Sequence, residues 1–206
     1  MKYFVTSDTH YGHGNIITYC HRPFRDLAHM NERLMKNFNE RVKPEDTCFF
    51  LGDFCFKNSP GGNQGEGVPV KSDEYINALN GKKVFVKGNH DGNNSTKTII
   101  ENLVINYGGL RIAMIHDPCD FLESTTFNRV ELNLCGHVHQ NWKHTWRGNS
   151  MEHLLVNVGV DVWKFYPATL DEVIGYALKA WKGQPDFKSR LKHNTRSDVR
   201  YGDLCA

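Results

Sequence analysis

Residues 83–91 read KVFVKGNHD. The short run of Val and Phe in this stretch is typical of a buried β-strand. An amide, an imidazole and a carboxylate follow, on Asn89, His90 and Asp91. The stretch therefore predicts a strand that ends in side chains able to bind a metal ion or move a proton.

The same pattern, a short apolar run that ends in metal-binding side chains, occurs at four other places. These runs cover residues 2–7, 47–52, 111–116 and 130–136, and a sixth apolar run covers 154–159. The side chains at their ends are Asp8 and His10, Asp53, His116 and Asp117, and His137 and His139. Ligands of open α/β sheets bind beyond the carboxyl ends of the strands, so we expect these groups on one rim.

Two segments predict amphipathic helices. Apolar residues recur at three- and four-residue spacing from Leu27 to Val42, and a capping box from Thr169 to Glu172 opens a stripe that ends at Trp181. Helices between strands in the first half, then mainly strands in the second, indicate a layered α/β sandwich with a mixed sheet.

The chain length of 206 residues fits one domain. We expect this domain over residues 1–182 and a polar tail over 183–206. The Gly-rich stretch 57–70 lacks the ending of a phosphate-binding P-loop, so it is interpreted as a surface loop or a flap near Asp53.

Composition excludes several classes of protein. The net charge of +2 gives no global positive field for long nucleic acid. No apolar run is long enough to span a bilayer, and the start of the chain does not resemble a signal peptide. The 6 cysteines form no C-x-x-C pair and several lie in apolar runs, which predicts reduced thiols and a cytoplasmic protein.

The cluster of carboxylates and imidazoles points to metal ions. Such groups would be costly side by side unless divalent cations neutralise and coordinate them, and the simplest occupant is a pair of metals. Imidazole, carboxylate and amide donors without a thiolate favour Mn²⁺, with Zn²⁺, Fe or Ni²⁺ as alternatives, over Mg²⁺ or Ca²⁺. Glycines at 52, 88 and 136 fit loops that approach the metals closely.

In these motifs the chain resembles the calcineurin-like metallophosphoesterases. D-x-H, G-D, G-N-H-D, a lone His that closes a strand, and G-H-x-H occur in that order over residues 8–139. The flanking residues 9–24 and 157–167 resemble the small single-domain bacterial and phage members. The resemblance implies a four-layer αββα sandwich with mixed β-sheets.

The resemblance also implies a division of labour in the site. One metal is expected on Asp8, His10, Asp53 and His139, and the other on Asp53, Asn89, His116 and His137. Two metals can acidify a shared water and stabilise an in-line displacement, so a hydroxide that bridges them is the expected nucleophile. His90 is expected to protonate the leaving oxygen as general acid, with its imidazole oriented by Asp91.

Three further residues are candidates for substrate binding. His13 and Asn15 follow the first metal loop closely enough to contact a phosphate, although loop and helix-cap roles explain them equally well. Arg22 could clamp a phosphate oxygen in bidentate fashion, or form an ordinary ion pair.

Together these features predict a metal-dependent phosphoric ester hydrolase. The favoured activity is that of a phosphodiesterase for a small, nucleotide-like substrate. A phosphomonoesterase is an alternative, and so is a nuclease or end-processing enzyme, which would need a basic groove or an accessory domain. A catalytically silent binding scaffold is the alternative of another class, but it would be expected to show broken motifs. No sequence pattern indicates an oligomeric state.

Overall fold

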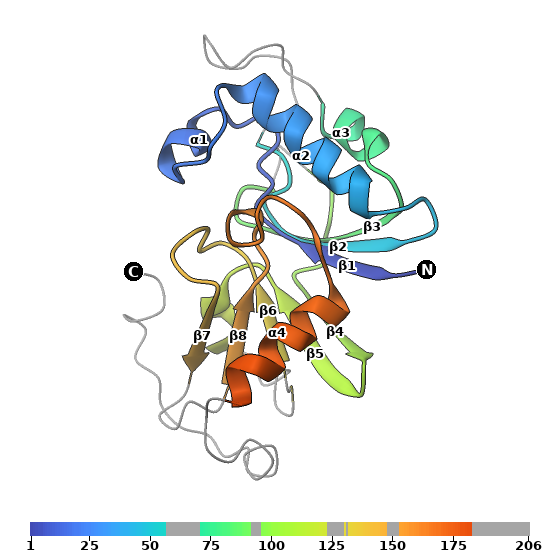
Figure 1. Ribbon diagram of the computed structural model, residues 1–206, viewed down its shortest axis with the longest axis vertical. Coiled ribbons are helices and arrows are strands. Elements are labelled where there is room, and N and C mark those ends of the chain that lie inside the picture. The colour runs from blue at the N-terminus through green and yellow to red at the C-terminus, as the bar shows by residue number, and fades with distance from the viewer. Residues whose placement is uncertain (57–70, 92–95, 123–129, 131, 148–152, 183–206) are drawn as a thin grey trace.

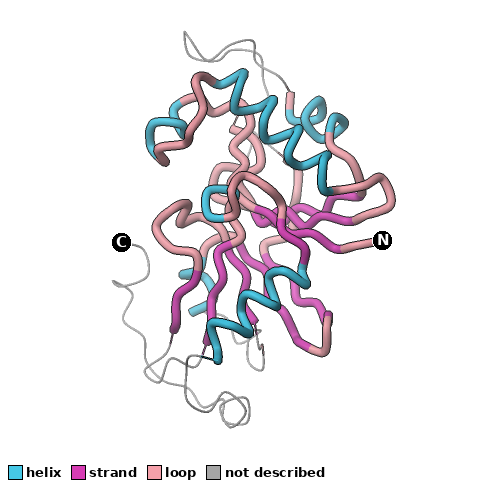
Figure 2. The backbone as a smooth tube through the Cα atoms, in the orientation of Figure 1, coloured by secondary structure: helices cyan, strands magenta, loops and turns pink. Residues whose placement is uncertain are grey.

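Figures 1 and 2 show the computed structural model, which describes residues 1–56, 71–91, 96–122, 130, 132–147 and 153–182. Within these ranges the chain forms two mixed β-sheets that pack against each other. The stretch 57–70 and the tail 183–206 lie outside the described residues. The expected boundary between domain and tail therefore stays a prediction.

The first sheet has four strands in the order β3-β2-β1-β9. They are β1 (Tyr3–Thr6), β2 (Thr47–Leu51), β3 (Lys82–Val86) and β9 (Ala168–Thr169). β1, β2 and β3 are parallel, whereas β9 is antiparallel to β1. Successive side chains of a strand point to opposite faces, so Phe4 packs outward among helix residues and Val5 packs inward against the second sheet.

The second sheet has five strands in the order β4-β5-β6-β8-β7. They are β4 (Asn102–Tyr107), β5 (Leu110–Ile115), β6 (Leu132–Cys135), β7 (His144–Arg147) and β8 (His153–Asn157). The three central strands β5, β6 and β8 are parallel, and the two edge strands are antiparallel to their neighbours. The parallel strands of each sheet thus end at one edge, where their loops can meet.

Three of the four described helices, α1 to α3, cover the first sheet on its outer side (Figure 1). The helices are α1 (Asn15–Tyr19), α2 (Leu27–Arg41), α3 (Ser72–Ala78) and α4 (Leu170–Lys182), with the 3₁₀ turns η1 (Pro118–Leu122) and η3 (Val160–Val162). Asp26 caps the start of α2, and its carboxylate accepts a hydrogen bond from the His29 N–H at 2.7 Å. α4 packs along the core between the two sheets, and η1 contributes Phe121 to the outer face of the second sheet.

The predicted α/β sandwich with mixed sheets is confirmed. Each of the six apolar runs forms a strand, and both predicted helices form as α2 and α4. Of the four expected layers, α1 to α3 form the first, and the two sheets form the second and third. On the outer face of the second sheet, where the fourth layer is expected, the described residues form η1. The strands β4, β7 and β9 and the helices α1 and α3 were not predicted from the sequence.

Cysteine usage follows the expectation at three buried residues. Cys48, Cys55 and Cys135 are buried thiols that form no disulfide. None of the described helices is both long and apolar enough to cross a membrane.

Candidate metal centre

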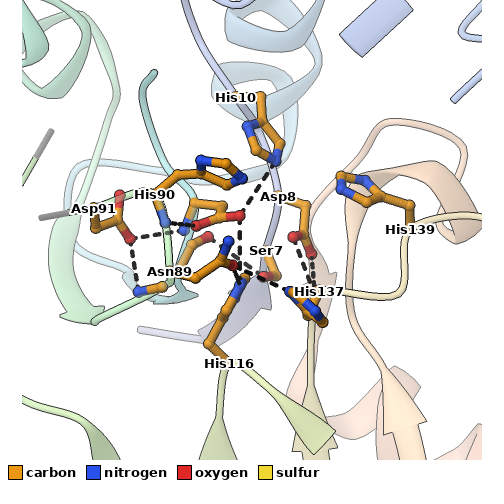
Figure 3. A network of polar contacts seen from close by, with 12 residues as sticks. Ser7, Asp8, His10, Asn89, His90, Asp91, His116, His137 and His139 are labelled. Carbon is orange, nitrogen blue, oxygen red and sulfur yellow. Dashed lines mark hydrogen bonds and ion pairs between the residues drawn. The ribbon is translucent and has the colours of Figure 1, made fainter. Parts of the chain in front are cut away.

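The loops that follow β1, β2, β3, β5 and β6 meet at one edge of the sandwich and bring the predicted metal ligands together (Figure 3). Backbone hydrogen bonds join these loops across the gap between strands. The Asp8 N–H donates to the Gly52 carbonyl at 3.1 Å, and the Gly136 N–H donates to the His116 carbonyl at 2.9 Å. The predicted convergence on one rim is what the structure shows.

A first group of potential ligand atoms consists of Asp8, His10 and His139. One ligand atom from each lies within 4.8 Å of the other two. The side chains of Asp8 and His10 are buried, and His10 Nε2 is 3.4 Å from Asp53 Oδ2. The four residues expected on the first metal are therefore neighbours.

A second group consists of Asp8, Asp53 and His116, again within 4.8 Å of one another. Asp53 Oδ2 is 3.4 Å from His116 Nε2. The amide oxygen of Asn89 lies 2.8 Å from His116 Nε2 and 3.1 Å from His137 Nδ1. The Asp53 carboxylate thus stands between the two groups, and Asp8 takes part in both, which the sequence did not predict.

The chemistry of these side chains fits divalent cations. Both ring nitrogens of His10 are buried and have no hydrogen-bond partner among the described residues. A buried polar atom without a partner is costly, and a metal ion would satisfy one of these nitrogens. The Asp8 and Asp53 carboxylates are both buried within reach of imidazoles, which is the donor set of a borderline metal.

The site also stabilises positive charge, as its pKa values show. Burial by itself would lower the pKa of His139, but its contacts with Asp161 and with Cys20 raise it to about 10. Burial by itself would also lower the pKa of His116, but its contacts with Asp53 raise this pKa to about 9. His10 differs because burial dominates and lowers its pKa. Contacts with carboxylates thus raise the pKa at two of these imidazoles, His139 and His116.

The backbone at the site adopts a conformation that is rare for residues with a side chain. Positive φ angles between 46° and 70° occur at Asp8, His10, Asp53, His137 and His139. Such left-handed conformations are costly and persist only where surrounding contacts enforce them, typically at functional sites. These left-handed residues let the alternate side chains of D-x-H and H-x-H point into the same space.

Glycines allow the loops to approach closely, as predicted. Gly52 has a φ of 87°, and a Cβ there would collide with the His116 ring and with the backbone of Gly88. A Cβ on Gly136 would overlap Ser7 Oγ and Asp8 Oδ2. Both positions therefore need glycine for the site to close.

Asp91 has a different role from the one expected. Its carboxylate is buried and accepts hydrogen bonds from three backbone N–H groups: Asp53 at 2.7 Å, Gly88 at 2.9 Å and Phe54 at 3.1 Å. These bonds tie the loop after β2 to the loop after β3. Asp91 thus clamps the loops that carry the ligands, and both of its oxygens are engaged by backbone amides rather than by the imidazole of His90.

His90 lies at the open side of the site, beside the first group (Figure 3). Its side chain is exposed, and its ring centroid is 5.6 Å from that of His10. Its backbone N–H donates to Asp53 Oδ1 at 2.9 Å, which fixes the loop beneath the ring. The imidazole is therefore close to the first group of potential ligand atoms without belonging to either group.

The expected substrate residues separate in the structure. His13 is buried and stacks on Phe56, with ring centroids 3.9 Å apart, and its ring centroid lies 5.4 Å from that of His10. Asn15 is exposed as the first residue of α1, while Gly14 takes the N-cap position. His13 is thus part of the wall next to the site, and Asn15 lies at the surface.

Arg22 forms an ion pair, which was the alternative to a phosphate clamp. Its guanidinium is buried and forms a bidentate ion pair with Asp161, with Nε 2.8 Å from Oδ1 and Nη2 2.9 Å from Oδ2. It also donates to the carbonyl oxygens of Asp8 at 2.7 Å and Thr9 at 3.2 Å. These contacts occupy the nitrogens that would have clamped a phosphate.

Asp161 is the site residue that sequence reasoning missed. Its Oδ2 is 2.9 Å from His139 Nδ1, and Cys20 lies within 4.8 Å of the same pair. Burial would raise the pKa of Asp161, but its contacts with His139 and Arg22 lower it, which keeps the carboxylate ionised. A signal was present, because Asp161 follows the sixth apolar run just as other site residues follow theirs.

Comparison with known proteins agrees with this geometry. The profile of a family described as the calcineurin-like phosphoesterase superfamily domain matches residues 1–169. An uncharacterized protein of Methanocaldococcus jannaschii is 34% identical over 173 residues, which cover 84% of this chain and 89% of that protein. The crystal structure of a protein of unknown function from Aquifex aeolicus shares the fold, with a TM-score of 0.62, 24% identity and coverage of 85% and 98% of the two chains.

Proposed function

Because the chain belongs to the calcineurin-like phosphoesterase superfamily, we propose that it is a phosphoesterase with two divalent metal ions, Mn²⁺ in the first place. The observation that carries this proposal is the position of Asp53, whose Oδ2 is 3.4 Å from Nε2 of both His10 and His116. A carboxylate oxygen between two sets of imidazoles is suited to bridge two metals. An intact donor set also favours an enzyme over a silent scaffold.

Each metal has an assigned set of ligands in this proposal. The first would be held by Asp8, His10, Asp53 and His139, and the second by Asp53, Asn89, His116 and His137. When bound, the two cations would acidify a water molecule and neutralise the charge of a phosphate. The protein contributes the spacing, because its left-handed turns and backbone hydrogen bonds fix the donors before any ion arrives.

His90 is proposed as the general acid. Its exposed imidazole next to His10 can reach a leaving oxygen on the open side of the site, where substrate must enter. Its ring is not needed as a ligand, so it can carry a proton. Asp91 supports it only indirectly, by clamping the loop from which His90 projects.

A small, nucleotide-like phosphodiester is the proposed substrate. The ring of Phe56 lies 6.2 Å from that of His90 and stacks on His13, and Tyr19 on α1 is 66% exposed with its ring 6.3 Å from that of His13. These rings form an aromatic wall next to the general acid, against which a base can stack. In this view His13 supports the wall, and Asn15 at the start of α1 contacts the outer part of the substrate.

Steady-state assays on matched substrates test the proposal. The Mn²⁺-loaded protein is expected to hydrolyse bis-p-nitrophenyl phosphate and a cyclic nucleotide faster than p-nitrophenyl phosphate or labelled single-stranded DNA. Asp53→Asn should lose both metal content and activity, whereas His90→Ala should keep the metals and lose activity. Preference for the monoester, or for DNA, would replace the diesterase assignment by one of those activities. Full metal content without any hydrolysis would favour a scaffold.

A further inference from the structure

Behind the candidate metal centre, Arg22 and Asp161 form a buried ion pair that touches two of the proposed ligands. Side-chain exposure is 0% for Arg22 and 2% for Asp161. On the basis of the proposed function, we propose that this Arg22–Asp161 pair is a positioning unit that sets the affinity of the first metal position, the one with Asp8, His10 and His139, and acts far less on the second position.

The first step of the argument is the contact between Asp161 and His139. A carboxylate can only accept a hydrogen bond, so the 2.9 Å contact places the proton of His139 on Nδ1. Nε2 is then the nitrogen with a lone pair for a metal. A carboxylate behind a metal-binding imidazole fixes its tautomer and orientation and raises its basicity, and loss of such a partner typically costs 10- to 100-fold in metal affinity, as an order of magnitude.

The second step is the reach of Arg22 to the other side of the same metal position. One guanidinium holds Asp161 and also donates to the backbone carbonyls of Asp8 and Thr9. Asp8 and Thr9 follow β1, whereas Asp161 lies in η3 after β8. The pair therefore couples two segments that are distant in sequence and sets the distance between Asp8 and His139.

The third step is the contrast with the second metal position. There the Nδ1 of His116 contacts the backbone carbonyl of Leu51 at 2.8 Å, so the neutral main chain orients this imidazole. The side chains of Arg22 and Asp161 have no contact with His116, Asn89 or His137 among the hydrogen bonds of the described residues. Asp8 lies in both groups of potential ligand atoms, but Asp161 contacts the first group through His139, so a change at Asp161 should act mainly on the first metal.

Titration of the metal-free protein with Mn²⁺, followed by the electron paramagnetic resonance signal of free Mn²⁺, measures both affinities. Asp161→Asn keeps the shape and one acceptor but removes the charge, so we expect one of two binding steps to weaken by about 10- to 100-fold and the other to stay within about 2-fold. The matched control is Glu172→Gln in the ion pair of Arg41 and Glu172, which is 2.6 Å long and joins α2 to α4. This control should leave both steps unchanged.

Two further variants keep the test decisive. Arg22→Met/Asp161→Asn removes both buried charges, so it remains informative if Asp161→Asn alone lowers the melting temperature of the metal-free protein. In this double variant, Mn²⁺ binding at the first metal position should weaken as in the single variant. Cys20→Ser tests the alternative that Cys20, His139 and Asp161 bind a metal themselves; in our proposal it leaves both steps unchanged.

The outcomes separate this inference from the proposed function. If wild type binds two metals but both Asp161 variants bind them with wild-type affinity, or if both steps weaken equally, the positioning unit is refuted and the phosphoesterase stands. Weakening by Cys20→Ser to the same extent would likewise overturn it in favour of a thiol ligand. If wild type binds no metal, the proposed function fails, and the inference fails with it.

Discussion

Replacement of Asp91 tests how the metal-binding loops are held. In Asp91→Ala, the backbone N–H groups of Asp53, Phe54 and Gly88 lose their shared acceptor in a buried place. Hydrogen bonds to a charged group contribute about 1.5–3 kcal/mol each, and water entering the vacated space recovers part of the loss. We expect the free energy of unfolding to fall by about 3–5 kcal/mol, the cost of breaking a buried charged network.

Urea unfolding of the metal-free protein measures this loss. Asp26→Ala is the control, because Asp26 accepts one backbone hydrogen bond at the exposed start of α2 and should cost about 1 kcal/mol. A loss for Asp91→Ala no larger than that of the control would refute the clamp. Unchanged stability together with a large fall in kcat would instead restore the original expectation that Asp91 orients His90.

Three other predictions follow from the same structure. His90→Gln should lower kcat by about 10²- to 10⁴-fold with unchanged metal content, and less for p-nitrophenyl esters, whose leaving group needs little protonation; an equal loss for nucleoside leaving groups would contradict a general acid. Chelation should lower the melting temperature, because metal at 100-fold its Kd contributes about 2.7 kcal/mol, and an unchanged melting curve would contradict a folded metal site. The backbone N–H groups of Lys43 and Lys2 hold the pKa of Asp46 below its ordinary value, so its stabilisation is present above that value and is lost as pH falls through the folded pKa. Asp46→Asn should therefore flatten the loss of stability in acid, measured by unfolding at a series of pH values, and a slope equal to that of wild type would contradict it.

Much of the fold and of the metal centre was readable from the sequence because one physical pattern repeats. Buried strands need apolar runs, and ligands of α/β sheets bind beyond the carboxyl ends of the strands. The place of Asp8, Asp53 and His116 at the candidate metal centre was therefore predictable from their positions after such runs. Edge strands lack this signal: β4 is only half-buried along most of its length, and β9 has two residues. The sequence therefore predicted the centre of each sheet better than its edges.

The residues that support the ligands were harder to predict. Asp91 follows His90 directly, yet its carboxylate turns to the backbone of another loop, a direction that sequence adjacency does not reveal. Arg22 and Asp161 are separated by 139 positions, so their ion pair depends on how β1 and β8 come together in three dimensions. Charged residues were thus recognisable as candidates, while their partners required the structure.

Anomalous diffraction from crystals soaked in Mn²⁺ tests the central claim most directly. The account predicts two peaks about 3.5–4 Å apart, a spacing usual for two-metal sites, with the Asp53 carboxylate between them and the imidazoles of His10 and His116 on opposite sides. A single peak, or peaks away from Asp53, would contradict a dinuclear centre at this edge of the sandwich.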